Sequence, residues 1–119
     1  MKIIVDTNFL IYSLRFKIDI VSELRGHSVF VLSRVIKELE WLSRKKSQDS
    51  MYAKLALSLI KRKSFKRLKS IEKTTDMSLV AYSKKGYAIA TQDREIIKNV
   101  KRHGGKLIYL RQKKYVVFE

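Results

Sequence analysis

The chain contains no cysteine, no proline and only four glycines in 119 residues. Without cysteine it can form no disulfide, no thiol nucleophile and no cysteine-ligated zinc or iron–sulfur site. The few glycines form neither a dinucleotide-binding fingerprint nor a P-loop, so dehydrogenases and P-loop nucleotide hydrolases lack support. The two histidines, His27 and His103, stand apart from any serine or cysteine motif. We interpret both as surface residues and find no nucleophilic triad.

Long apolar runs are also missing, although 45% of the residues are hydrophobic. Charged residues interrupt every longer stretch, so the sequence predicts no membrane-spanning helix. The apolar run near the start, Ile3-Ile4-Val5, is too short for a signal peptide, and we therefore expect a cytoplasmic protein. The length is typical of a single domain that spans residues 1–119.

Acidic residues are scarce, with 11 Asp and Glu against 27 Lys and Arg, which gives a formal charge of +16. A small domain with this imbalance is expected to bind a polyanion, and nucleic acid is the leading candidate. An anionic membrane surface is disfavoured, because the basic residues do not gather on one amphipathic helix. The predicted nucleic-acid-binding residues lie in two basic runs: Lys61, Arg62, Lys63, Lys66 and Arg67, and Arg111, Lys113 and Lys114.

Short β-type runs alternate with longer helical ones along the chain. The strands are predicted at residues 2–5, 28–32, 87–90 and 106–110, with a weaker one near 67–71 and a further edge strand possible at 115–118. The helices are predicted at residues 7–16, 18–25, 33–45, 50–62, 76–85 and 93–103. We expect Ser33 to be the N-cap of its helix. The pattern predicts a three-layer α/β/α fold around a mainly parallel, five-stranded sheet.

Three of the few acids follow predicted strands. Asp6 ends the first strand, Asp93 follows residues 87–90, and Asp76 opens the helix after the weak strand. In a parallel sheet such positions converge at the carboxyl edge. Asp76 and Asp93 can equally be simple helix caps. Asp6 is harder to explain in that way, because burying a carboxylate costs several kcal/mol unless a cation or hydrogen-bond donors compensate.

A fourth carboxylate is predicted in the helix at residues 33–45. Glu38 borders the apolar stripe of that helix, but Glu40 borders its other edge almost as closely, so helical geometry alone does not choose between them. Neighbouring carboxylates repel one another until a cation binds. Ligation by oxygen alone favours Mg²⁺ or Mn²⁺, either of which can activate a water for phosphodiester hydrolysis.

Four segments of the sequence resemble the PIN-domain family. They are residues 4–10 (IVDTNFL), 33–40 (SRVIKELE), 74–83 (TTDMSLVAYS) and 90–96 (ATQDREI), and the ending KLIYLRQKK is similar to small archaeal members. The resemblance implies a metal-dependent endoribonuclease that cleaves single-stranded RNA with metal-activated water. It favours Glu38 over Glu40, because the family's helix acid is followed by an apolar residue.

The resemblance also assigns roles to individual residues. The metal-binding and catalytic residues would be Asp6, Glu38, Asp76 and Asp93. Supporting residues would be Asn8, Thr91, Arg94 and Glu95. Arg94 would hold a phosphate or pair with a surface acid. Met77 stands where many relatives carry a further acid, which would mean a single tightly held metal, weak activity, or a site completed by Glu95 or by the RNA.

The biological role stays open between the toxin of a toxin–antitoxin pair and a ribosomal-RNA-processing nuclease. The corresponding partners would be RNA with an antitoxin or with a ribosome-related protein. A catalytically weak or inactive PIN fold that binds RNA or protein is the alternative function. A receiver-type signalling domain is disfavoured, because Asp6-Thr7-Asn8 lacks an acidic pair. PIN-like domains commonly pair, so we expect a homodimer and interpret Trp41 as a candidate contact, with stacking on a base as the alternative.

Overall fold

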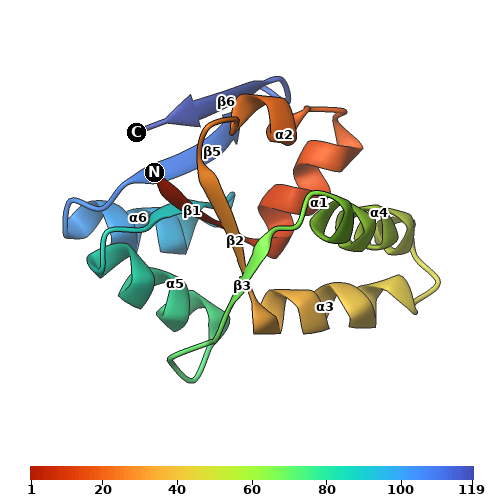
Figure 1. Cartoon of the computed structure of the whole chain (residues 1–119), viewed down its shortest axis with the longest axis horizontal. Coiled ribbons are helices and arrows are strands. Elements are labelled where there is room, and N and C mark those ends of the chain that lie inside the picture. Colours follow the sequence, from red (N-terminus) through yellow and green to blue (C-terminus); the bar gives the residue numbers. More distant parts are fainter.

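The computed structural model describes residues 1–119, with six strands and six helices (Figure 1). The strands are β1 (Lys2–Val5), β2 (Ser28–Leu32), β3 (Lys66–Leu68), β4 (Ala88–Ala90), β5 (Leu107–Arg111) and β6 (Tyr115–Phe118). The helices are α1 (Thr7–Arg15), α2 (Ile20–Glu23), α3 (Ser33–Ser43), α4 (Gln48–Arg62), α5 (Thr75–Lys84) and α6 (Arg94–Arg102). None of these helices has both the length and the apolar character needed to cross a membrane.

The strands form one sheet in the order β3-β2-β1-β4-β5-β6. The first five strands in this order are parallel, as predicted, and β6 pairs antiparallel with β5. The predicted count of five strands is wrong, because residues 115–118 do form the edge strand. The turn before β6 places Gln112 and Lys113 at φ 55° and 56°, which a tight hairpin requires but which glycine or asparagine usually provides. The sequence therefore gives no strong hairpin signal there.

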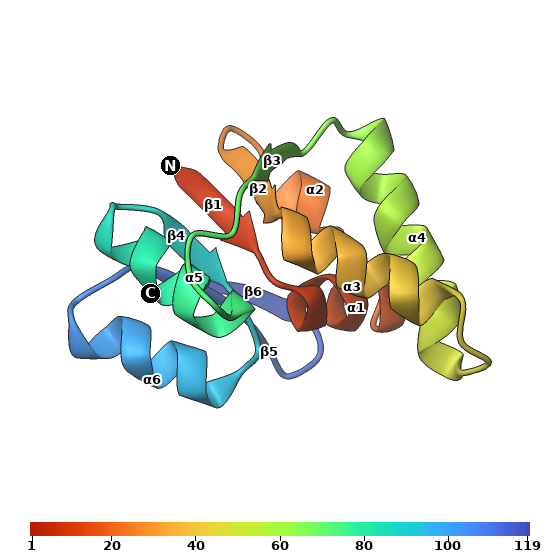
Figure 2. The same cartoon turned by 90° about the horizontal axis from the view of Figure 1, so that it is seen from below.

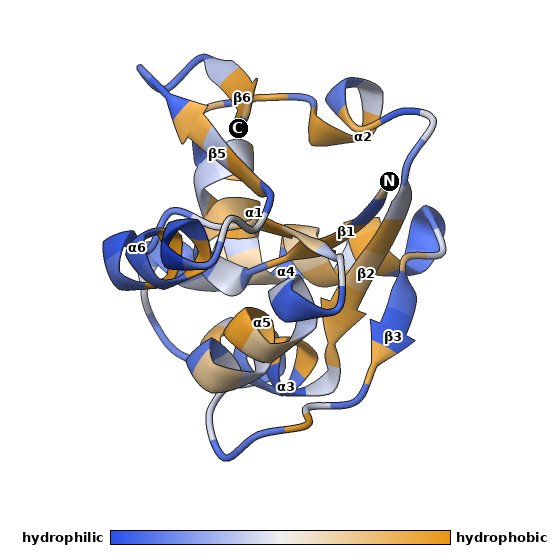
Figure 3. Ribbon diagram, turned by 90° about the vertical axis from the view of Figure 1, so that its left-hand side faces the viewer, coloured by the Kyte–Doolittle hydropathy of each residue, from blue (hydrophilic) through white to orange (hydrophobic).

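Helices cover both faces of the sheet (Figures 1 and 2). On one side α1 and α3 pack against α4, and on the other α5 packs against α6. The core consists of 27 buried hydrophobic residues, among them Ile3, Ile4 and Val5 of β1, which are fully buried. A parallel strand covered on both faces is expected to be continuously apolar. Figure 3 shows this for β1 and β2, whereas the edge strand β3 is polar, which explains its weak signal.

Two predicted helix starts differ from the structure. The strand β2 runs directly into α3, so Leu32 is the N-cap and Ser33 is already helical, with no side-chain cap bond. The predicted helix at 18–25 shortens to α2, which is a single turn capped by Asp19. The remaining helices start or end within about two residues of their predictions, which is the usual uncertainty of helix ends.

The strand order also locates the functional edge. β1 lies between β2 and β4. The chain leaves β1 into α1 and β4 into α6, and these two helices lie on opposite faces of the sheet. In open parallel sheets, ligands bind outside the carboxyl ends of the strands where the strand order reverses. Asp6 follows β1 directly and Thr91 follows β4 directly, so both residues lie at this point.

Candidate active site at the carboxyl edge of the sheet

Asp6 lies at the end of β1, where it is the N-cap of α1. Its backbone N–H donates to the Ala90 carbonyl at 2.9 Å, which joins it to β4. The Thr7 N–H donates to Asp6 Oδ1 at 2.9 Å, and the Thr91 hydroxyl donates to Asp6 Oδ2 at 3.0 Å. These hydrogen bonds fix both carboxylate oxygens. The residue is also buried, with only 7% of its surface exposed.

Asp93 is held by the segment that joins β4 to α6. Its N–H donates to the Thr91 hydroxyl oxygen at 3.1 Å, so Thr91 connects Asp6 with Asp93. Asp93 Oδ1 accepts hydrogen bonds from the N–H groups of Glu95 and Ile96, which makes Asp93 the N-cap of α6. The capping interpretation of Asp93 is thus correct. It occupies Oδ1 and leaves Oδ2 for another ligand.

Gln92 fixes this segment from the other side. Its Nε2 donates to the Leu110 carbonyl at 3.1 Å, and its Oε1 accepts from the Leu110 N–H at 2.5 Å. The side chain therefore mimics one residue of a neighbouring strand at the end of β5. Thr91 and Asp93 flank Gln92, so their positions depend on this pair of bonds.

Glu38 extends from α3 toward Asp6 through Thr7. The Thr7 hydroxyl donates a hydrogen bond to Glu38 Oε1 at 2.5 Å, while the Thr7 N–H donates one to Asp6 Oδ1. Glu40 instead lines a separate pocket with Lys61 and Arg67. The structure therefore brings Glu38, and not Glu40, to the side of α3 that faces the end of β1.

Asp76 lies in the first turn of α5, but it is not the cap of that helix. The cap is Thr74, whose hydroxyl oxygen accepts from the Met77 N–H at 3.1 Å, so the alternative that Asp76 is a helix cap is wrong, while its predicted place at the start of the helix is correct to within one residue. The loop before α5 is held by Ser78, whose hydroxyl oxygen accepts from the N–H groups of Ile71 and Glu72. Arg34 of α3 also donates to the carbonyl of Lys73. These bonds place the first turn of α5 beside α3.

The four acids are close enough for their charges to act on one another. The pKa of Asp6 is raised from 3.8 to about 6, mainly by burial and to a lesser extent by the charges of Glu38 and Asp76, while the hydrogen bonds from Thr91 and Thr7 lower it. The pKa of Asp76 is raised by partial burial and by the charges of Asp93 and Glu38. These carboxylates thus oppose one another's ionisation, as expected of groups without a counter-ion.

No basic side chain neutralises these acids. The salt bridges of the protein join Arg15 to Asp49 and Lys101 to Glu119, so none involves Asp6, Glu38, Asp76 or Asp93. Most other acids of the chain also lack a salt bridge, so these four are distinguished by the action of their charges on one another. The oxygen donors and their uncompensated charge fit a divalent cation such as Mg²⁺ or Mn²⁺. As the side chains stand, however, no three acids form a group that is ready to hold a metal ion.

The supporting residues surround this cluster. Thr91 is fully buried and makes the two bonds described above. Asn8 is exposed and lines a pocket of about 490 Å³ that also contacts Thr7, Glu38 and Gln92. Arg94 and Glu95 are exposed in the first turn of α6, and neither side chain makes a salt bridge. On the other side, a pocket of about 530 Å³ adjoins Asp76 and is lined by Lys84 and Lys85.

The two predicted basic runs lie in different places. Arg111 ends β5 directly after Leu110, which bonds Gln92, so Arg111, Lys113 and Lys114 lie at the carboxyl edge with the acids. The other run ends α4 and begins β3, and its members line pockets that contain none of the four acids. These residues are Lys61, Lys63, Lys66 and Arg67, with Arg62 exposed beside them.

Sequence reasoning missed two residues that organise the site. Thr7 bridges Asp6 and Glu38, and its place in the motif Asp6-Thr7-Asn8 was a usable signal. Gln92 had no usable signal, because its partner Leu110 is 18 residues away and the pairing depends on the sheet register. Long-range polar contacts of this kind follow from the tertiary fold and not from local pattern.

The comparisons with known proteins agree with this fold. A family model described as "PIN like domain" matches residues 3–113. Because this match spans most of the chain, the protein belongs to the PIN-like domain family, as the sequence motifs predicted.

Two curated relatives match over nearly the whole chain. One is "Ribonuclease VapC4" of Methanocaldococcus jannaschii, 30% identical over 96% of this chain and 93% of its own. The other is "Ribonuclease VapC9" of Archaeoglobus fulgidus, 34% identical over 98% of this chain and 87% of its own. A solved domain of a functionally unknown protein from Methanocaldococcus jannaschii has the same fold, with a TM-score of 0.67 and 16% identity over 92% of this chain and 91% of its own.

Proposed function

We propose that this protein is an endoribonuclease that cleaves single-stranded RNA and depends on Mg²⁺ or Mn²⁺, with Asp6, Glu38, Asp76 and Asp93 as its metal-binding and catalytic residues. One observation carries the proposal: in a chain of +16, these acids meet at the carboxyl edge without a basic partner, and the pKa of buried Asp6 is about 6. The two relatives named as ribonucleases support the reaction class.

The residues divide the work according to their contacts. Thr7 and Thr91 orient both oxygens of Asp6, and Thr7 also directs Glu38 toward it. Thr91 and the first turn of α6 fix Asp93 with Oδ2 free. A bound divalent ion would supply an activated water and neutralise charge on the phosphoryl group. The four carboxylates alone do not neutralise that charge, because they are themselves anionic. None of these side chains is placed as an activated nucleophile either.

Two pockets flank the acids and provide a path for the RNA strand. The pocket of about 490 Å³ contacts Thr7, Asn8 and Glu38, and the pocket of about 530 Å³ contacts Asp76. Lys84 and Lys85 line the second pocket and are positioned to bind phosphate there. A strand that passes from one pocket to the other would lay a phosphodiester across the four acids. Arg94, Arg111, Lys113 and Lys114 would add phosphate contacts at the same edge.

The relatives bear on the biological role. Both carry VapC names, which favours the toxin of a toxin–antitoxin pair, and so an antitoxin partner, over a ribosomal-RNA-processing nuclease with a ribosome-related partner. A gene immediately upstream that encodes a small protein with an acidic tail would support the toxin role. We further propose a homodimer, with Trp41, which is 51% exposed, in the contact.

A second candidate function is an RNA- or protein-binding module without cleavage. Met77 favours it, because this exposed residue follows Asp76 where a further acid would add a ligand. The absence of a group of three acids ready for a metal favours it as well. Glu95 is the remaining acid of the α6 N-terminus that could supplement the four.

Cleavage of labelled single-stranded RNA separates the two functions. Wild-type protein is expected to cut with Mn²⁺ and to stop in excess EDTA. Asp93→Asn keeps the cap but removes a charged ligand, so cleavage should fall by orders of magnitude. Asp19→Asn, which changes the exposed cap of α2 in the same way, serves as the matched control and should cut like the wild type. Cleavage that persists in EDTA, or equally in Asp93→Asn, would refute the metal mechanism.

A further inference from the structure

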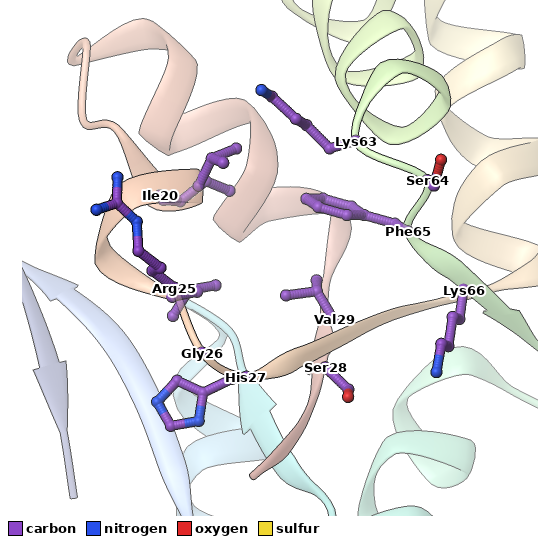
Figure 4. A pocket seen from close by; sticks show the side chains of 12 residues that line it. Ile20, Arg25, Gly26, His27, Ser28, Val29, Lys63, Ser64, Phe65 and Lys66 are labelled. Carbon is purple, nitrogen blue, oxygen red and sulfur yellow. The ribbon is translucent and has the colours of Figure 1, made fainter.

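A further pocket, of about 420 Å³, lies at the opposite edge of the sheet from the acids (Figure 4). It is formed by α2, the start of β2 and the segment that joins α4 to β3, and Ser28 and Val29 line it. Asp6 lies level with Leu32, because Ile4 pairs with Phe30. Ser28 precedes Leu32 by four positions, so about 13 Å of strand at ~3.3 Å per residue separates the two levels.

The pocket combines an apolar floor with basic walls. Ile20, Leu24 and Val29 form the floor with the ring of Phe65. Figure 4 shows Arg25 on one side and Lys63 on the other, with Ile20 between them and the ring of Phe65 beside Lys63. Lys66 also lines the pocket, and no aspartate or glutamate does. The pocket is large enough for one nucleotide-sized group, since small-molecule sites begin at about 300 Å³.

A neighbouring pocket continues this basic surface. Ser64 and Phe65 line both pockets, so they form the wall between them. The neighbouring pocket, of about 430 Å³, adds Lys61 and Arg67 and a single acid, Glu40. None of these cations makes a salt bridge, because the two salt bridges of the protein use Arg15 and Lys101. Unpaired cations are thus gathered around an aromatic ring.

We propose that this surface, formed by Arg25, Lys61, Lys63, Phe65, Lys66 and Arg67, is a second binding site for single-stranded RNA. One base would lie on the apolar floor against Phe65, and the flanking phosphates would contact Arg25 and Lys63. Proteins that bind single-stranded nucleic acid without sequence preference commonly use aromatic rings within a basic groove. Surface lysines are often merely solvated, but here they surround an apolar hollow. Because this surface continues into the neighbouring pocket of about 430 Å³, it fits an RNA strand better than a single nucleotide.

The pocket around Ser28 and Phe65 lies too far along the strands from the acids for one nucleotide to contact both, although Arg67 lies nearer to them, level with Val31. It would therefore hold a part of the strand several nucleotides from the bond that is cut, and would add affinity and steer the substrate. Binding there needs no metal and no cleavage. The inference goes beyond the proposed ribonuclease and stands or fails separately from it.

The binding of a fluorescently labelled twelve-nucleotide oligouridylate in EDTA tests the site. Arg25→Gln with Lys63→Gln is compared with Lys98→Gln with Arg102→Gln, which removes the same charge from exposed positions on α6. If both pocket cations contact phosphate, the slope of log affinity against log salt should fall by about 1.4, at ~0.7 per contact. The α6 control should change it less. Equal changes in the two variants would overturn the proposal.

Phe65→Leu tests the contribution of the ring. It should weaken oligouridylate binding by at least about fivefold, the lower end of a base–aromatic stack. Because Phe65 also packs on the core, affinity is measured well below each melting temperature, and Phe16→Leu, an aromatic change outside the pocket, is the control. A loss no greater than that of the control would contradict the proposal.

Competition identifies the ligand. Unlabelled oligouridylate should displace the label, whereas uridine monophosphate or a polyglutamate peptide at equal charge should do so at least tenfold less well. Displacement by the monophosphate as strong as by the strand would assign the pocket to a free nucleotide. Displacement by the peptide would assign it to an acidic protein. Either result would overturn the assignment to an RNA strand.

Discussion

Asp6 carries its carboxylate where burial opposes its charge. Its side chain is nearly enclosed, yet Thr7 and Thr91 aim donors at both oxygens. Burial outweighs these donors, and the pKa of Asp6 rises from 3.8 to about 6. Ionised Asp6 therefore costs folding free energy in the absence of a cation, and a bound cation would relieve that cost.

This conflict predicts how stability depends on pH without metal. The pKa of Asp6 is higher in the folded chain than in the unfolded chain. The contribution of Asp6 to the free energy of unfolding is therefore fully present below about pH 4 and is lost as the pH rises through about 6. Each pKa unit corresponds to ~1.4 kcal/mol. In EDTA at pH 7.5, Asp6→Asn should therefore unfold with a free energy higher than wild type by up to about 3 kcal/mol, on the order set by that shift.

Chemical denaturation at pH 7.5 and at pH 3.5, both in EDTA, measures this effect. The advantage of Asp6→Asn should largely disappear at the lower pH, because Asp6 is then mostly protonated in both states. Asp19→Asn changes the exposed cap of α2 and is the control. If Asp6→Asn is the less stable protein at both pH values, Asp6 is a structural cap and the account of its burial is wrong.

At the residue scale, the sequence predicts the buried acid better than its partners. Asp6 was evident because an acid at the end of an apolar strand needs compensation. Thr91 came from the family motif, while Gln92 was not recognised, because its bonds to Leu110 require knowledge of the register of β4 and β5. Glu38 was distinguished from Glu40 by family resemblance and not by helix geometry, and its bond to Thr7 agrees with that choice.

The segment between β4 and α6 is the element that joins two of the acids. Gln92→Ala removes both bonds to β5 and leaves the Leu110 backbone unpaired, at a cost of roughly 1–3 kcal/mol. Because Thr91 and Asp93 flank Gln92, cleavage should fall by about tenfold or more, the effect of a small misplacement. Gln48→Ala, exposed at the start of α4, is the control.

The measurement pairs a thermal melt with kcat for cleavage at 20 °C, where both variants are folded. A Gln92→Ala protein that melts lower but cleaves like the wild type would show that the segment only stabilises the fold. In that case the orientation of Asp93 would depend on the cap of α6 alone.

Strands and helices of strong pattern were predictable at the element scale. The apolar strands β1, β2 and β4 are buried in the sheet centre, so their composition is unambiguous. The edge strands were harder, because β3 reads Lys-Arg-Leu and β6 follows a turn whose residues seldom adopt positive φ. Tertiary pairing stabilises both strands, and local preference does not reveal it.

The whole molecule combines a strongly basic surface with one acidic edge. RNA affinity should therefore be dominated by phosphate contacts and should fall linearly on logarithmic axes with salt, at about 0.7 per contact on single strands. A triple variant, Lys61→Gln, Lys63→Gln and Arg67→Gln, should reduce that slope by about 2 and leave Mn²⁺ affinity unchanged.

Fluorescence anisotropy across a range of potassium chloride concentrations in EDTA gives the slope. A response that is flat with salt would remove the electrostatic argument for RNA. The sequence alone indicated the total charge, but it did not show that Arg111, Lys113 and Lys114 share the edge of the acids while Lys63 lines a pocket with Ser28 at the other edge. That division follows from the register and direction of the strands.

The most direct test of the central claim is calorimetric titration of Mn²⁺ into wild-type protein, Glu38→Gln and Glu40→Gln at pH 7.5. The two variants lose the same charge from neighbouring positions of α3, but only Glu38 contacts Thr7 beside Asp6. We expect saturable binding to the wild type and to Glu40→Gln, with at least a tenfold loss in Glu38→Gln, as for loss of a metal ligand. Absence of binding to the wild type, or equal affinity in the two variants, would contradict it.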